Sequence, residues 1–259
     1  RSNKEIRKVR GTEIGFVFQD PMTSLNPTMR IGAQIEEVFL GRTDVTKKEV
    51  KEKALEIMRL VGISDVEKRY KQYPHELSGG MKQRVMIAIA LVSSPSLIIC
   101  DEPTTSLDVT IEAQILDLLL KLREQFGTSI IMITHDLGVI AKICDRVAVM
   151  YGGKIVEQGT ADEIFYDTAH PYTNGLMSSI TRMDMGKDEK LSPIEGTPPD
   201  LFAPPVGCPF AARCEYAMDI CYDRLPDFWD LTGEHKTRCW LQHEMAPNVD
   251  LRMKKREEE

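Results

Sequence analysis

Long apolar segments are missing from this 259-residue sequence. No run of 18 apolar residues occurs, so no segment is predicted to span a bilayer as a helix, and no signal-peptide pattern opens the sequence. Clustered positive charge is also scarce. The formal net charge is −7, and the one tight basic cluster, at residues 254–256, is followed by three glutamates. Because phosphate contacts need clustered Lys and Arg, we exclude broad, non-specific binding to nucleic acid.

A loop for binding phosphate is missing as well. The sequence contains no Gly-x-x-x-x-Gly-Lys-Ser/Thr string, whose backbone amides and lysine hold the β- and γ-phosphates of a nucleotide. It begins at Arg1 rather than at a methionine. The missing phosphate loop becomes informative only in combination with the motifs that the sequence does contain.

Hydrophobic patterns predict alternating strands and helices, which is the α/β class. Apolar runs at residues 97–100 and 129–134 suit strands of a parallel sheet covered on both faces, and residues 12–18 predict a strand ending at Gln19. A predicted helix at residues 109–125 joins two of these strands into a βαβ unit. Four other segments are predicted: a loop at 20–27, a helix at 46–61 opened by a capping box, a buried helix at 79–93, and a hairpin at 147–158.

Four short strings follow one another between residues 77 and 136. They are Leu-Ser-Gly-Gly-Met-Lys-Gln-Arg, Leu-Ile-Ile-Cys-Asp-Glu-Pro, Ser-Leu-Asp and Ile-Thr-His-Asp. In this order they resemble the second half of an ATP-binding-cassette (ABC) ATPase. The resemblance covers roughly residues 14–160 and implies a RecA-like core with a helical signature subdomain at about residues 30–94.

Candidate catalytic residues stand after the predicted strands, at the sheet edge where open α/β folds bind ligands. Asp101 can hold Mg²⁺ there, directly or through water, and Glu102 can orient or deprotonate the water that attacks the γ-phosphate of ATP. Taken alone, Asp-Glu-Pro could be a simple turn, and a lone histidine such as His135 is more often structural. The resemblance implies that His135 is the switch histidine, which contacts the γ-phosphate. It also implies that Gln19 is the Q-loop glutamine, which touches Mg²⁺ and the attacking water.

A second group of candidates opens two predicted helices. Ser78, Gly79 and Gly80 lie at a helix start, where free amides and the helix dipole favour an anion; an ordinary N-cap is the alternative for Ser78. In the family this signature binds the γ-phosphate of ATP held by the opposite subunit. Asp108 resembles the D-loop residue that links the two sites.

Two parts of the family pattern are absent from the sequence: the phosphate loop and the aromatic residue that stacks on adenine. We therefore expect an ABC ATPase domain that lacks its amino-terminal Walker A part. Without that loop, charge-assisted hydrogen bonds to the triphosphate and a Ser/Thr ligand to Mg²⁺ are lost. We expect this polypeptide alone to bind ATP poorly or not at all.

Three further segments, at residues 19–27, 170–177 and 195–214, resemble ATPase subunits of oligopeptide and dipeptide importers; nickel and some sugar importers share the pattern. The resemblance implies an energy-coupling subunit that hydrolyses ATP as a dimer beneath two membrane permeases, peripheral to the cytoplasmic face of the membrane. An extracytoplasmic peptide-binding protein would deliver the substrate, and residues 21–29 would receive a coupling helix of the permease. Because paired but distinct ATPase subunits are common in this subfamily, a heterodimer is expected.

Two other functions remain as alternatives. A repair or translation ATPase would share the motifs, but the acidic charge and the importer-like tail count against it. A degenerate partner subunit could supply only the signature Ser78-Gly79-Gly80 in trans, although a dead site has no need of Asp101, Glu102 and His135.

The composition shifts after Arg182, which predicts an ATPase domain at residues 1–182 and a cysteine-bearing module at 183–259. Cys100 and Cys144 lie in apolar contexts and are predicted core residues. The other four follow the spacing C-x5-C-x6-C-x17-C, which can hold zinc or a [4Fe–4S] cluster, with disulfides or free thiols as further alternatives. Similar tails in dipeptide-importer ATPases imply the [4Fe–4S] cluster. The proposed ligands are Cys208, Cys214, Cys221 and Cys239.

Overall fold

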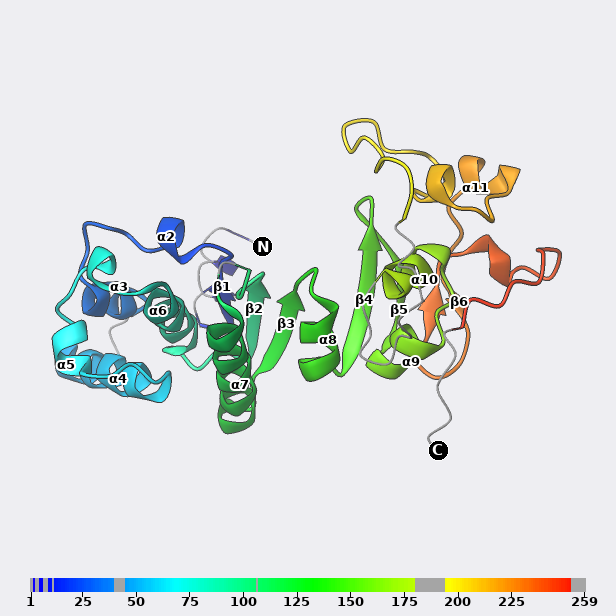
Figure 1. The fold of residues 1–259 in the computed structure, drawn as a ribbon. Helices are drawn as coiled ribbons and strands as arrows, with labels where there is room; N and C mark the ends of the chain where they lie inside the picture. The colour runs from blue at the N-terminus through cyan, green and yellow to red at the C-terminus, as the bar shows by residue number, and fades with distance from the viewer. Residues whose placement is uncertain are drawn as a thin grey trace. The chain divides into compact units, whose positions relative to one another are not determined.

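The computed structural model describes residues 2, 5–6, 9–10, 12–39, 45–105, 107–179 and 194–252 (Figure 1). The chain divides into two compact units, Arg1–Ile143 and Cys144–Glu259, and each is described by itself. Among the described residues, no helix combines the length and the apolar character needed to cross a bilayer.

The first unit is built on a three-stranded parallel sheet in the order β1-β2-β3. The strands are β1 (Ile14–Val17), β2 (Leu97–Asp101) and β3 (Ser129–Ile133), close to the predicted ranges. Their register places Val17, Cys100 and Met132 in one row across the sheet. Val17 and Cys100 are fully buried on the face that joins the helical core.

The opposite face of this sheet differs from the prediction. Phe16, Ile131 and Ile133 are 38%, 49% and 48% exposed, so the expectation of a sheet covered on both faces is wrong for the described part of this unit. The apolar runs misled because both sheet faces carry apolar side chains, while the described helices of the unit bury only one of them.

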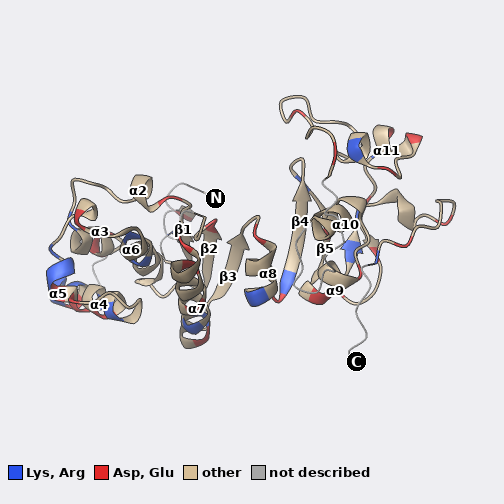
Figure 2. Ribbon diagram, viewed as in Figure 1, with Lys and Arg blue, Asp and Glu red and all other residues tan. Residues whose placement is uncertain are grey.

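Helices account for most of the rest of the first unit, and polar caps explain several of their starts. Thr46 and Glu49 form the predicted capping box of α4, with the Glu49 N–H donating to Thr46 Oγ1 (3.3 Å). Residues 20–27 are not all loop, because the Asp20 carboxylate caps a short helix by accepting from the Met22 N–H at 2.7 Å. Acidic and basic residues are interspersed along α4, and the short α5 carries both signs (Figure 2). The elements are α2 (Pro21–Ser24), α3 (Ile31–Glu37), α4 (Lys47–Leu60), α5 (Val66–Arg69), the 3₁₀ turn η1 (Pro74–Glu76), α6 (Gly79–Leu91), α7 (Val109–Phe126) and α8 (Leu137–Ile143).

The second unit contains a four-stranded antiparallel sheet in the order β4-β5-β7-β6. Strands β4 (Arg146–Tyr151) and β5 (Lys154–Thr160) form the predicted hairpin, and β7 (Lys236–Thr237) pairs with β5 through Glu157 and Thr237. The remaining elements are α9 (Ala161–Tyr166), α10 (Pro171–Ser178), η2 (Ala211–Arg213), α11 (Asp219–Asp223), β6 (Trp229–Asp230) and η3 (Trp240–Gln242).

The predicted domain boundary at residues 182–183 lies outside the described residues and stays a prediction. The segments on either side of it, 144–179 and 194–252, belong to the same compact unit. They share one sheet because β7 pairs with β5.

Candidate functional site

The predicted catalytic residues meet at the carboxyl edge of the β1-β2-β3 sheet. Gln19, Glu102 and His135 each follow one of the three adjacent strands. The Gln19 Nε2–H donates to Glu102 Oε2 at 2.7 Å, and His135 Nδ1 lies 3.0 Å from Glu102 Oε1. Because parallel strands end at a common edge, residues 116 positions apart in the sequence lie around one carboxylate.

Hydrogen bonds hold the Glu102 carboxylate ionised. The bond with His135 contributes most, followed by that with Thr105 and, more weakly, that with Gln19, and together they lower the pKa of Glu102. Thr105 donates its hydroxyl to Glu102 Oε2 at 3.0 Å. Sequence reasoning missed Thr105, although its position three residues after Glu102 in a turn was an available signal.

The backbone at Glu102 is strained. Its φ angle is +43°, a region that residues with a side chain rarely adopt, and its N–H donates to the Ile133 carbonyl of β3 at 2.8 Å. A strained backbone persists only where the surrounding structure holds it in place, and such residues are concentrated at functional sites. Asp101, the last residue of β2, stands beside it in the chain.

The signature residues and Asp108 form a second group, joined through two helix starts. Ser78 accepts a hydrogen bond from the Met81 N–H at 3.4 Å, so it is the N-cap of α6, the structural role given above as its alternative. Asp108 caps α7 by accepting from the Ile111 N–H at 2.9 Å. A methyl group added at Gly80 would lie 3.0 Å from Ile111, which ties the two starts together.

Gly79 stands apart from this packing. A methyl group added there would have open space, with no described atom within 4 Å outside its own helix backbone and chain neighbours. The packing of the described residues therefore gives no steric reason for glycine at position 79.

A buried lysine links α6 to the Gln19 loop. Lys82 is 7% exposed, and its ammonium group lies 2.8 Å from Met22 Sδ in α2. The two helices pack against each other. Sequence reasoning did not single out Lys82, because a charged residue one turn into a helix is usually solvated.

The four late cysteines converge in the second unit. Cys208, Cys214, Cys221 and Cys239 all line one small cavity. The Cys208 N–H donates to the Cys221 carbonyl at 2.7 Å, and a methyl group at Gly207 would lie 2.2 Å from that same oxygen. Only glycine therefore allows this close approach of two cysteine-bearing segments.

The four cysteines of this cavity are not cross-linked to one another; Cys239 is buried, and Cys208, Cys214 and Cys221 are half-buried. Burial raises the pKa of Cys239 to about 12 and that of Cys214 to about 11, with the other thiols nearby adding to the shift. Outside the cavity, Cys100 is a core residue as predicted, whereas Cys144 is only half-buried.

The cavity can be tested for its fit to a metal group. Among the described residues, no three His, Cys, Asp or Glu side chains are grouped as ligands of a metal ion; tetrahedral zinc needs sulfur atoms about 3.8 Å apart. An iron–sulfur cluster binds each cysteine at a different iron, so its ligands lie further apart. Arg238 also lines the cavity, and its Nε is buried without a hydrogen-bond partner. A cation with an unused donor suits a negatively charged cluster with four thiolates.

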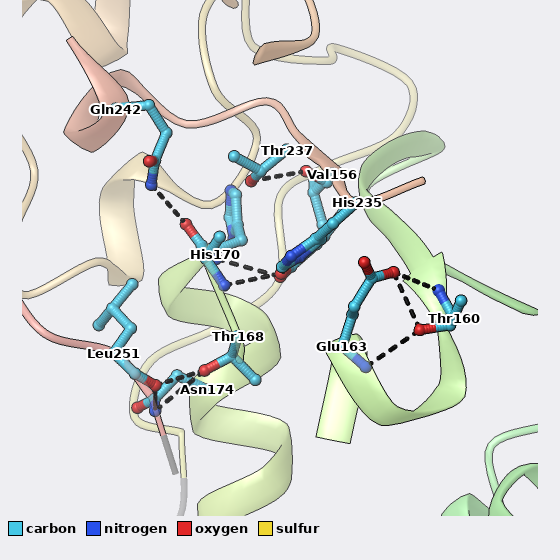
Figure 3. Close-up of polar contacts among 12 residues, drawn as sticks. Val156, Thr160, Glu163, Thr168, His170, Asn174, His235, Thr237, Gln242 and Leu251 are labelled. Carbon is cyan, nitrogen blue, oxygen red and sulfur yellow. Dashed lines mark hydrogen bonds and ion pairs between the residues drawn. The ribbon is translucent and has the colours of Figure 1, made fainter. Parts of the chain in front are cut away.

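Beside the cavity lies a fully buried polar network (Figure 3). Glu157 is 0% exposed and accepts from the N–H groups of Ala169 (2.7 Å) and His170 (3.0 Å). His235, 3% exposed, has its Nε2 2.7 Å from Glu157 Oε1. Burial alone would lower the pKa of His235, but the carboxylates of Glu157, Glu163 and Asp167 together outweigh burial and raise it. No sequence motif pointed to this pair.

His170 connects this network to the cysteines. It is 1% exposed and caps α10, with Nδ1 accepting from the Tyr172 N–H at 3.1 Å. Its Nε2 lies 4.0 Å from Cys208 Sγ. Burial lowers the pKa of His170 to about 3, so the ring is neutral.

Two family models match the chain. The model described as "ABC transporter" matches residues 1–105, and that described as "Oligopeptide/dipeptide transporter, C-terminal region" matches residues 156–221. The oligopeptide transport ATP-binding protein OppD of Bacillus subtilis is 55% identical over 96% of this chain and 70% of its own length. The dipeptide transport ATP-binding protein DppD of the same organism is 51% identical over 96% of this chain and 74% of its own length.

Solved structures agree with these matches. CbiO1 from Clostridium perfringens, part of the ABC transporter complex CbiONQ, aligns with a TM-score of 0.56 and 33% identity over 63% of each chain. The dimeric ATP-binding cassette MJ0796, in a post-hydrolysis state with ADP and phosphate, aligns with a TM-score of 0.55 and 31% identity. That alignment covers 62% of this chain and 68% of MJ0796.

Proposed function

Because the chain belongs to the ATP-binding subunits of ABC importers for oligopeptides and dipeptides, a family of ATPases that use ATP and Mg²⁺, we propose that residues at its β1-β2-β3 edge carry out the hydrolysis that drives peptide uptake. The observation that carries the proposal is the Glu102 carboxylate, ionised and held by Gln19, Thr105 and His135. A degenerate site would have no use for this arrangement. The arrangement therefore favours a catalytic subunit over a degenerate partner that supplies only its signature residues to the other subunit.

Each residue at this edge has a chemical role in the proposal. Glu102 orients the attacking water and accepts its proton, while Gln19 and Asp101 provide oxygen ligands for Mg²⁺ or its water shell. His135 faces Glu102 with Nδ1, which leaves Nε2 free to donate to the γ-phosphate.

The signature group serves the site of a second ATPase subunit. Ser78, Gly79 and Gly80 open α6, a helix of 13 residues whose first amides and dipole attract a phosphate. The open space around Gly79 supports this, because it leaves room for a ligand or a partner subunit to approach the backbone there. Asp108 links this group to its own site, and we propose a heterodimeric pair of ATPase subunits.

The Gln19 loop couples hydrolysis to transport. We place the chain at the cytoplasmic face of the membrane, beneath two permease subunits that take peptide from an extracytoplasmic binding protein. A permease helix would dock on the exposed Met22 side of α2. Since Lys82 joins α2 to α6, movement of the docked helix would reach the signature residues directly.

The catalytic proposal is tested in the assembled importer reconstituted in vesicles. Glu102→Gln, which keeps the side-chain shape, is expected to abolish ATP-driven peptide uptake while leaving ATP binding intact. Asp117→Asn, on the exposed face of α7, is the matched control. Normal turnover by the Glu102 variant would overturn the assignment.

The cysteine cavity holds a [4Fe–4S] cluster in the proposed function, with Cys208, Cys214, Cys221 and Cys239 as ligands. Bound there, the cluster would cross-link four segments of a small module. The test is anaerobic purification with iron and acid-labile sulfide measured beside the visible spectrum. About four of each per chain are expected, with loss in Cys214→Ser and retention in Cys144→Ser. One zinc per chain and no iron would replace the cluster with a single structural ion.

A further inference from the structure

The imidazole of His170 is held in one tautomer. Its Nδ1 accepts the Tyr172 N–H, so this nitrogen carries a lone pair and no proton. Because the neutral ring has one proton, that proton stands on Nε2. The side chain is 1% exposed, so water does not compete for the Nε2–H.

The Nε2–H of His170 has a sulfur atom as its neighbour. Cys208 Sγ lies 4.0 Å from Nε2, and both residues line the cavity shared by all four cysteines. The backbone N–H of His170 is separately fixed by the Glu157 carboxylate at 3.0 Å (Figure 3). The ring is therefore oriented through Nδ1 on an anchored backbone, and it presents its one donor to a cysteine.

We propose that His170 is a positioning residue that donates its Nε2–H to the Cys208 sulfur of the metal group in this cavity. The inference rests on the proposed [4Fe–4S] cluster. A hydrogen bond to a thiolate ligand withdraws negative charge from the sulfur, which favours the reduced, more negative state of a cluster. His170 therefore raises the reduction potential of the cluster, and it does so without being a ligand.

Two substitutions of His170 distinguish its hydrogen bond to Cys208 from its capping bond to the Tyr172 N–H. His170→Asn retains a short acceptor for the Tyr172 N–H but lacks a donor that reaches Cys208. His170→Gln places an amide N–H near the position of Nε2. In the full chain, purified anaerobically, we expect a lower midpoint potential for the Asn variant and partial return toward the native value for the Gln variant, measured by EPR-monitored redox titration.

A measurement on the unmutated chain tests the same hydrogen bond even if the variants fail to fold. The chain is labelled with ¹⁵N-histidine and reduced, and its pulsed EPR spectrum is searched for ¹⁵N coupling to the cluster. Coupling is expected, and it should vanish in His170→Gln. An iron-loaded chain without that coupling, or with a potential unchanged in His170→Asn, overturns the role of His170 and leaves the cluster standing. A chain without iron overturns both.

Discussion

Two glutamate–histidine pairs, one in each unit, use the same chemistry in opposite surroundings. In the first unit, Glu102 and His135 are 3.0 Å apart, with side chains 24% and 71% exposed. In the second, Glu157 and His235 are 2.7 Å apart, with side chains 0% and 3% exposed. The exposed pair has ring and carboxylate atoms within reach of a ligand, whereas the buried pair is enclosed by backbone donors. Burial therefore separates the pair that we propose for catalysis from a pair that is enclosed in the second unit.

The largest expected effect breaks the exposed pair. Glu102→Gln should lower the ATPase rate of the assembled importer by about 10²- to 10⁴-fold, the range for loss of a general base. Because the pair is solvated, the thermal unfolding midpoint of the variant should stay at the native value. Steady-state phosphate release and calorimetry measure the two quantities. A variant that unfolds at a lower temperature would mean that this pair, too, is structural.

The buried pair should respond in the opposite way. Glu157→Gln leaves a buried histidine without its carboxylate, and we expect a loss of about 3–5 kcal/mol in the free energy of unfolding of the second unit. Both tryptophans, Trp229 and Trp240, lie in that unit, so their fluorescence during urea denaturation reports on it. Glu234→Gln, at an exposed ion pair with Arg146, is the control, and a similar loss in that variant would contradict the comparison.

Two glycines, one in each unit, allow the same comparison between stability and activity with smaller expected effects. Gly207→Ala would collide with the Cys221 carbonyl, so we expect a cost of about 1–3 kcal/mol in the free energy of unfolding of the second unit and loss of the proposed cluster. Gly79→Ala has open space and should leave the stability of the first unit unchanged while lowering the ATPase rate of the dimer. Denaturation and metal analysis test the first variant, and phosphate release tests the second.

The smallest expected effect is a dependence of stability on pH. The pKa of His235 is raised in the folded chain, so its pairing stabilises the second unit fully below the unfolded pKa of about 6.5 and is lost as pH rises through the folded pKa. Glu157, Glu163 and Asp167 are the carboxylates that raise it. Tryptophan-monitored denaturation between about pH 6 and 8.5 should show decreasing stability, and His235→Gln should flatten the trend. If the dependence of stability on pH is unchanged in His235→Gln, another titrating group causes it.

Local patterns were sufficient to predict most elements, and the resemblance to a known family named the residues that meet at the sheet edge. The capping residues Thr46, Ser78 and Asp108 act on neighbours within three positions, so their signals are contained in short windows. Gln19, Glu102 and His135 were predictable because each follows an apolar strand, and parallel strands end at one edge. The exposed sheet face was not predictable, since an apolar run records which residues a strand has and not what covers them.

The sequence by itself determined the strand ends, the caps and the motif order, because these depend on neighbours along the chain. Only the tertiary structure decided that Glu157 is buried against His235 and that His170 faces Cys208. Glu157 and His235 are 78 positions apart, and His170 and Cys208 are 38 apart. The physical reason is that such contacts depend on which surfaces are excluded from water, and burial is a property of the packed chain rather than of any segment.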